Sequence, residues 1–229
     1  MIIKNQFNRS GFVVLKNFIK KNESKLFEKK LFKIYGNILK IKINKKNIHS
    51  IISQYEKNKN YDLLYAAFKK YSSDKCFENL SKKFSNLARK IFEKNYEFIN
   101  SGVAIGIKKS KRTAYNWHQE KPYYEKVNTL HFQFPILNPV NVKNGTMSVL
   151  EGSNELGFLK EVTNIKLSKK SINSFVPKKI NIFKKKYPEK YINLNLGDVC
   201  IFDENLIHKT NKNITNKIRF AGIIRLKKI

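Results

Sequence analysis

His118 and Glu120 are separated by one residue, and a second histidine, His208, lies far downstream. Side chains two residues apart on an extended segment project from the same side of the backbone, so an imidazole nitrogen and a carboxylate oxygen can reach one ion. A distant histidine can complete the ligand set. Two histidines and one carboxylate that leave coordination positions open are typical of non-haem Fe(II) oxygenases. We therefore predict a metal site formed by His118, Glu120 and His208.

Arg219 follows His208 in a segment, residues 217–223, that has the pattern of a core strand. The chain has 47 basic residues, yet only five are arginines: Arg9, Arg89, Arg112, Arg219 and Arg225. An arginine in such a lysine-rich chain suggests a need for its planar, two-pronged donor. A buried guanidinium without an anionic partner is costly, so we expect either an anionic ligand or a protein carboxylate beside Arg219. Arg225 is read as structural.

Residues 129–136 have the pattern of a strand, on which Thr129, His131 and Gln133 would point in one direction. His131 competes with His208 as the third metal ligand. We favour His208, because Arg219 follows it eleven residues downstream. His49 lies in a helical stretch and is expected to face solvent.

Four segments, in the same order, resemble the phytanoyl-CoA dioxygenase family, which comprises Fe(II)- and 2-oxoglutarate-dependent oxygenases. They are SGFVVLKNF at 10–18, WHQE at 117–120, NGTMSVLEGSN at 144–154 and GDVCIFD at 197–203. The chain departs from the family pattern at Glu120, where aspartate is usual, at Glu151, where proline is common, and at Asn154, where histidine is common.

The resemblance implies an enzyme that uses Fe(II), 2-oxoglutarate and O2, and that couples decarboxylation of 2-oxoglutarate to hydroxylation of a C–H bond. The distal carboxylate of 2-oxoglutarate would be the anionic partner of Arg219, and Thr210 could donate a hydrogen bond to it. The remaining candidate contacts in the cosubstrate pocket are Thr129, His131 and Gln133. The implied fold is α+β or mainly β, a double-stranded β-helix (jelly-roll, cupin-like) backed by N-terminal helices.

The composition suits one globular domain, because 229 residues with 41% hydrophobic side chains can form a full core. We expect a helical part over about 1–100, a barrel over about 101–229, and a lysine-rich, lid-like insertion over about 155–190 with a short helix and little strand pattern. Apolar spacing predicts helices near 22–41 and 74–98, and a helical stretch over 48–71 that Asn58 and Asn60 interrupt. Strands are predicted at 12–15, 103–107, 115–120, 129–136, 146–150, 191–196, 199–202 and 217–226.

The formal charge of +30 allows two interpretations. Binding of nucleic acid or of an anionic membrane is one. The other is codon bias, because lysine, asparagine and isoleucine are abundant together and the lysines are scattered. We favour the second. If part of the charge serves binding, the acidic partner expected is a small substrate that is phosphorylated, CoA-linked or nucleotide-linked. No apolar run is long enough to span a membrane, and no signal peptide is seen. With two distant cysteines, a cytoplasmic location is expected.

The sequence thus predicts an Fe(II)- and 2-oxoglutarate-dependent dioxygenase that hydroxylates a small organic substrate. The alternative is a basic protein that binds or modifies nucleic acid on the same barrel, with a vestigial or repurposed metal site. The +30 charge keeps this alternative open. The ligand set and Arg219 weigh against it.

Overall fold

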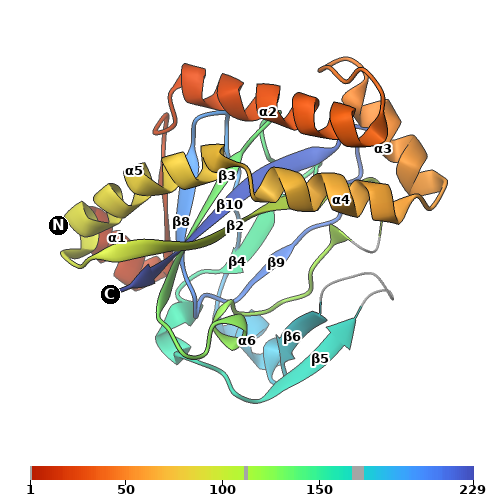
Figure 1. Ribbon diagram of the computed structural model, residues 1–229. Coiled ribbons are helices and arrows are strands. Elements are labelled where there is room, and N and C mark those ends of the chain that lie inside the picture. The colour runs from red at the N-terminus through yellow and green to blue at the C-terminus, as the bar shows by residue number, and fades with distance from the viewer. Residues whose placement is uncertain (1, 111–112, 167–172) are drawn as a thin grey trace.

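A computed structural model describes residues 2–110, 113–166 and 173–229, and it shows α-helices followed by antiparallel strands (Figure 1). The helices come mainly first: α1 (Ile2–Ser10), α2 (Lys21–Leu39), α3 (Ile48–Lys57), α4 (Tyr61–Ser72) and α5 (Lys75–Phe92), with α6 (Ile180–Lys186) later in the chain. α2 to α5 confirm the helical first part. The helix expected to reach residue 98 ends instead at Phe92, because Glu93 adopts a left-handed conformation with φ 57°.

Two antiparallel sheets follow. The larger has the strand order β1 (Phe12–Leu15), β8 (Val199–Asp203), β3 (Thr129–Pro135), β10 (Arg219–Lys228) and β2 (Tyr96–Gly106). The smaller has the order β7 (Glu189–Tyr191), β4 (Met147–Leu150) and β9 (His208–Thr210). The α+β class is therefore confirmed, but in the part of the chain that is described the two sheets do not join into a closed barrel.

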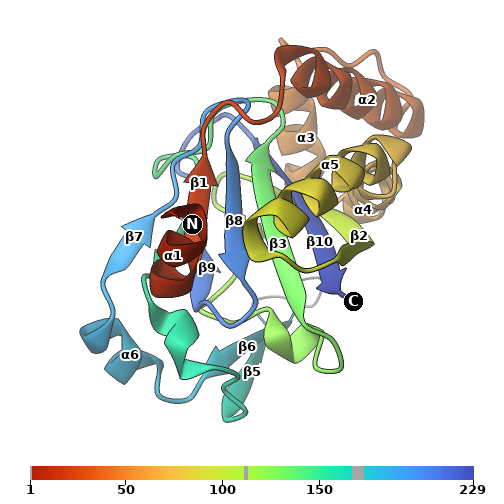
Figure 2. The same ribbon diagram turned by 90° about the vertical axis from the view of Figure 1, so that its left-hand side faces the viewer.

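Helices α2, α4 and α5 cover one face of the larger sheet, as Figures 1 and 2 both show, whereas α6 lies away from this layer. Aromatic side chains form this interface. Phe84 of α5 stacks on Phe132 of β3 at a centroid distance of 4.5 Å, and Phe27 of α2 packs on Phe134 at 5.3 Å. Since side chains alternate along a strand, the odd-numbered residues of β3 point to the opposite face, between the sheets. The helical layer thus fixes which side chains of β3 and β10 face the interior.

The insertion near 155–190 differs from the expectation. Besides α6, it contains a hairpin of β5 (Val162–Lys166) and β6 (Asn173–Pro177), so the prediction of little strand structure is wrong. The connection between these strands lies outside the described residues. Phe175 of β6 lies 5.0 Å from the ring of Tyr123, so the hairpin contacts the segment that follows Glu120.

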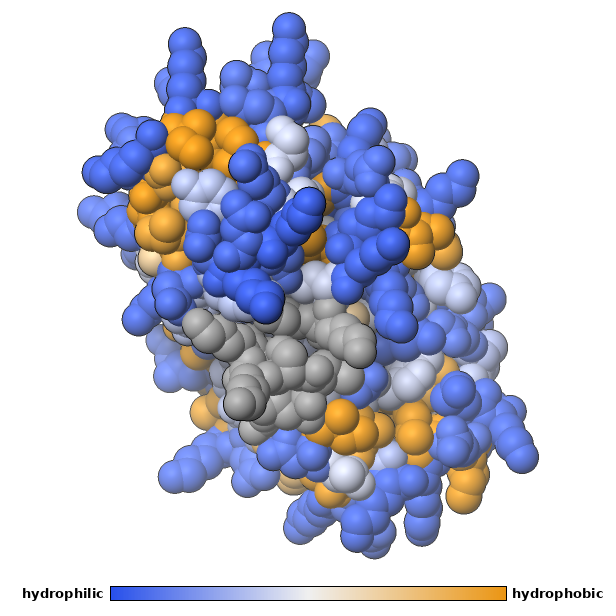
Figure 3. All heavy atoms as spheres, turned by 90° about the vertical axis from the view of Figure 1, so that its right-hand side faces the viewer, coloured by the Kyte–Doolittle hydropathy of each residue, from blue (hydrophilic) through white to orange (hydrophobic). Residues whose placement is uncertain are grey.

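The molecular surface is dominated by polar side chains. On the face drawn in Figure 3, hydrophilic side chains project over most of the area, and apolar residues appear as separate groups. No helix among the described residues is long and apolar enough to cross a membrane.

Candidate metal centre

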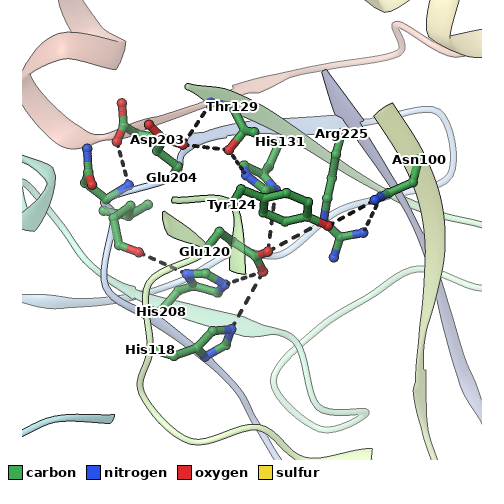
Figure 4. Close-up of polar contacts among 12 residues, drawn as sticks. Asn100, His118, Glu120, Tyr124, Thr129, His131, Asp203, Glu204, His208 and Arg225 are labelled. Atoms are coloured by element: carbon green, nitrogen blue, oxygen red, sulfur yellow. Dashed lines mark hydrogen bonds and ion pairs between the residues drawn. The ribbon is translucent and has the colours of Figure 1, made fainter. Parts of the chain in front are cut away.

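His118, Glu120 and His208 converge on one point (Figure 4). All three are buried, and one ligand atom of each lies within 4.8 Å of those of the other two. Oε1 of Glu120 lies 3.7 Å from Nε2 of His118 and 3.6 Å from Nε2 of His208. His131 does not belong to this cluster, so His208 occupies the third position that the two histidines competed for.

Backbone pairing brings the two histidines side by side. The N–H of His118 donates to the carbonyl of His208, and the N–H of His208 donates to the carbonyl of His118, each at 2.9 Å. The strand predicted at 115–120 is reduced to this isolated bridge. Glu120 has helical backbone angles (φ −78°, ψ −25°), and its N–H donates to the carbonyl of Glu204. The convergence therefore comes from pairing with distant segments and not from an extended His-x-Glu segment.

Local hydrogen bonds fix the tautomers of both histidines. Nδ1 of His118 lies 2.7 Å from the carbonyl oxygen of Asn116, and Nδ1 of His208 lies 3.0 Å from that of Leu206. Because a carbonyl oxygen can only accept, each Nδ1 carries the proton and each Nε2 presents a lone pair. Two bare nitrogens and a carboxylate oxygen thus face one another. This donor set fits a divalent cation, and two imidazoles with one carboxylate suit Fe(II).

Gln119, between the two ligands, anchors their loop, a role that sequence reasoning missed. Its side chain is 1% exposed; it donates to the carbonyls of Gly157 and Asn205 and accepts from the N–H of Leu159. All three bonds go to backbone atoms of other loops, so Gln119 ties the loops around the site together. A polar residue between two ligands was the available signal, because its side chain must point away from them.

The second carboxylate oxygen of Glu120 faces the other way. Oε2 lies 3.5 Å from Nε of Arg225 and 3.8 Å from Nδ1 of His131. Burial would raise the pKa of Glu120, but the positive charge of Arg225 opposes burial, and the pKa lies well below its usual range. Burial, with repulsion from His118, lowers the pKa of His208 despite the attraction of Glu120. These shifts favour an ionised carboxylate at Glu120 and a neutral imidazole at His208.

Thr129 and His131 lie behind Glu120 in a buried chain of hydrogen bonds. Nε2 of His131 lies 2.8 Å from Oγ1 of Thr129, which donates at 2.7 Å to Oε2 of Glu204. Lys121 pairs with Glu204 at 3.3 Å. Burial lowers the pKa of His131 to about 3, although Glu120 opposes the shift. Glu204 was not singled out from the sequence. Thr129 and His131 are thus engaged in contacts behind Glu120, and neither residue lines the neighbouring cavity.

That cavity, of about 440 Å³, opens beside the three converging residues. Gln133 and Thr210, both predicted cosubstrate contacts, line it, as do Tyr115 and Arg225. Further lining comes from aromatic residues that include Phe68, Tyr123, Tyr124 and Phe202. The volume is within the range of small-molecule sites.

Arg219 is 2% exposed and is not itself in the cavity wall. Its Nη1 donates to the carbonyl of Gly145, while Nε and Nη2 have no hydrogen-bond partner among the described residues. Burial lowers its pKa to about 10, and the nearby Tyr115 opposes this shift. On β10, Arg219 alternates onto the same face as Ile223 and Arg225, which do line the cavity. Arg219 is thus a buried cation without a carboxylate partner in the described chain.

His49 differs from the expectation of a solvent-facing side chain. Its Nδ1 accepts the N–H of Ile218, so it links α3 to the start of β10. The helical spacing around His49 could not reveal this contact, because the partner is far away in the sequence.

Two antiparallel sheets around a triad of two histidines and one carboxylate define the class of non-haem iron oxygenases. The model of the phytanoyl-CoA dioxygenase family matches residues 7–221, and the chain belongs to this family. The family comprises iron- and 2-oxoglutarate-dependent oxygenases, and His118, Glu120 and His208 form its triad in this chain. No curated protein matches the chain significantly.

Solved structures share the fold at low sequence identity. The epimerase SnoN, crystallised with Fe³⁺, alpha-ketoglutarate and nogalamycin RO, aligns with a TM-score of 0.68 and 12% identity, covering 99% of this chain and 82% of SnoN. EctD from S. alaskensis, crystallised with 2-oxoglutarate and 5-hydroxyectoine, gives 0.62 and 16%, covering 98% and 74%. AviO1 from Streptomyces viridochromogenes Tue57 gives 0.60 and 11%, covering 99% and 93%.

Proposed function

We propose that the protein is a hydroxylase that binds Fe(II) and 2-oxoglutarate and acts on a small organic substrate carrying an anionic group. A phosphorylated, CoA-linked or nucleotide-linked compound would meet this description. Two observations in the interior carry the proposal. Three bare acceptor atoms face one point, and Nε and Nη2 of the buried Arg219 have no hydrogen-bond partner among the described residues. A divalent metal would satisfy the three acceptor atoms, and a carboxylate would satisfy the two donors.

The metal and 2-oxoglutarate would be held by different residues. Nε2 of His118, Nε2 of His208 and Oε1 of Glu120 would hold the metal, each in the orientation described above. Arg219 would receive the distal carboxylate of 2-oxoglutarate through Nε and Nη2, with Thr210 as a second donor. When bound, Fe(II) supplies the means of using O2 to oxidise an unactivated C–H bond.

The cavity wall supports the view of a small substrate. The wall includes the aromatic side chains of Phe68, Tyr115, Tyr123, Tyr124 and Phe202, and aromatic surfaces suit an apolar carbon skeleton. The anionic group proposed for the substrate is supported by the formal charge of +30 on the protein. The alternative, action on nucleic acid, rests on the same charge alone, and no feature of the cavity favours it.

The test is production of succinate from 2-oxoglutarate by purified protein with Fe(II) and O2, with and without candidate substrates. We expect succinate from the wild type, no succinate from Glu120→Ala, and stimulation by an anionic compound but less by its uncharged counterpart. Glu97→Ala is the matched control for loss of a carboxylate outside the centre, since Glu97 is an exposed residue of β2. If the wild type makes no more succinate than Glu120→Ala under any condition, the proposed activity is wrong.

A further inference from the structure

The two oxygens of Glu120 have separate environments. Oε1 faces the bare Nε2 atoms of His118 and His208, whereas Oε2 faces Arg225 and His131 (Figure 4). Both oxygens of a carboxylate can bind a single ion. A glutamate has one more rotatable bond than an aspartate, so its carboxylate has more freedom to turn both oxygens towards that ion. Whatever holds Oε2 decides whether Glu120 offers the metal one oxygen or two.

His131 cannot hold Oε2 by donating to it. The hydroxyl of Thr129 has one proton, which goes to the carboxylate of Glu204. The oxygen of Thr129 is therefore the acceptor for His131, so Nε2 of His131 carries the proton and Nδ1 is bare. Consistently, Nδ1 of His131 has no hydrogen-bond partner among the described residues. Two lone pairs thus face each other at 3.8 Å, and the ion pair with Nε of Arg225 at 3.5 Å is the favourable contact of Oε2.

Arg225 is held in place by its neighbours. In the larger sheet it pairs with Asn100 of β2 on one side and with His131 of β3 on the other. Its Nη1 donates to Oδ1 of Asn100 at 3.2 Å, and its guanidinium carbon lies 5.8 Å from the centre of the Tyr124 ring. Nδ2 of Asn100 in turn donates to the hydroxyl of Tyr124 at 3.1 Å. The register between β10 and β2 shifts directly after Arg225, because Leu226 pairs with Phe98 and Ile99 of β2 is passed over.

We propose that Arg225 is a positioning residue that holds Oε2 of Glu120 and so keeps this ligand monodentate. This inference rests on the proposed metal site. A second oxygen from Glu120 would occupy one of the coordination positions that the cosubstrate and O2 require. Arg225 thus keeps these coordination positions open, although the side chain of Glu120 is longer and has more rotatable bonds than that of an aspartate. Asn100, Arg225 and His131 lie side by side on three neighbouring strands. This alignment fixes the position of the Arg225 guanidinium beside Oε2 of Glu120.

The experiment counts the water molecules on Mn(II) bound to the full-length protein. Water enriched in the magnetic isotope of oxygen broadens the electron paramagnetic resonance lines of Mn(II) in proportion to the number of coordinated waters. We compare the wild type with Arg225→Gln, which removes the cation, and Arg225→Lys, which retains one that can reach Oε2. Arg89→Gln is the matched control, since Arg89 is an exposed residue of α5. If Arg225→Gln does not fold, Arg225→Met takes its place.

We expect Arg225→Gln to bind Mn(II) at least as tightly as the wild type but with one fewer coordinated water, because Oε2 takes that position. Arg225→Lys and Arg89→Gln should keep the wild-type number of waters. A purely structural role for Arg225 would instead weaken Mn(II) binding and leave the waters unchanged, and that result overturns the inference. A wild type that binds no Mn(II) would contradict the proposed function itself, so the two failures are distinguishable.

Discussion

Replacement of Arg219 by lysine should weaken 2-oxoglutarate binding without harming the metal site. In the structure Nη1 of the guanidinium donates to the carbonyl of Gly145, whereas Nε and Nη2 have no hydrogen-bond partner in the described chain. A lysine offers one point charge in place of the two-pronged fork. Loss of one charge-assisted hydrogen bond costs about 1.5–3 kcal/mol, which corresponds to a Kd increase of about 10- to 150-fold.

Arg219→Met gives a second, opposite readout, on stability. Arg219 is 2% exposed, so its charge is buried without a protein carboxylate, and a methionine of similar length removes that burden. We expect the free energy of unfolding without ligand to be unchanged or higher by about 1–4 kcal/mol, the range seen when buried ionic groups are replaced by apolar ones. By contrast, the wild type should gain about 2.7 kcal/mol from 2-oxoglutarate at 100 times its Kd, and the variant should gain almost nothing.

The assay is isothermal titration of 2-oxoglutarate into Mn(II)-loaded protein, combined with thermal unfolding of each variant with and without ligand. Binding of Mn(II) itself serves as the control and should be the same in the wild type, Arg219→Lys and Arg219→Met. Equal affinities for 2-oxoglutarate in the three proteins, or collapse of the ligand-free Met variant, would show that Arg219 is a structural residue.

The remaining predictions concern the ligands, the pH dependence and the charge. His208→Ala should reduce metal affinity by more than the about 10- to 100-fold that loss of a second-layer partner costs, whereas His49→Ala should bind metal normally by titration. Burial keeps His131 neutral in the folded protein down to about pH 3. The unfolded chain takes up that proton near the ordinary pKa of 6.5, so stability should fall as pH falls from about 6.5 to 3. His131→Phe should lose this component, which denaturant melts at pH 7 and pH 4 can measure. Duplex DNA should bind no more tightly than the ~10⁻⁴ to 10⁻⁶ M typical of non-specific contacts at physiological salt, and anisotropy titrations at several salt concentrations would detect a specific site.

The residues that carry chemistry by their type were accessible from the sequence. Two histidines, a carboxylate and a rare arginine have few alternative uses when buried together, and the order of the motifs placed them in one fold. The direction of Thr129, His131 and Gln133 also followed from strand alternation. The reason given for the convergence of His118 and Glu120 was wrong, however, because Glu120 is not in an extended segment.

The parts that sequence reasoning missed depend on long-range register. Arg225 meets Glu120 because β10 pairs with both β2 and β3, and no local pattern encodes which residues fall opposite one another. Glu204 contacts Thr129 across 75 positions of the chain for the same reason. The short helix α1 was missed because its sequence, IIKNQFNRS, is mostly polar and buries only Phe7 and Ser10. Tertiary contacts, more than local preference, decide such segments.

We propose above that His118, Glu120 and His208 bind a divalent metal beside a site for 2-oxoglutarate. Crystals grown with Mn(II) and 2-oxoglutarate test it most directly, because anomalous scattering locates Mn(II) independently of any assumed chemistry. We expect a single anomalous peak between the two Nε2 atoms and Oε1 of Glu120, with density for a carboxylate at Nε and Nη2 of Arg219. A peak at another place, or an empty triad with 2-oxoglutarate bound elsewhere, would contradict it.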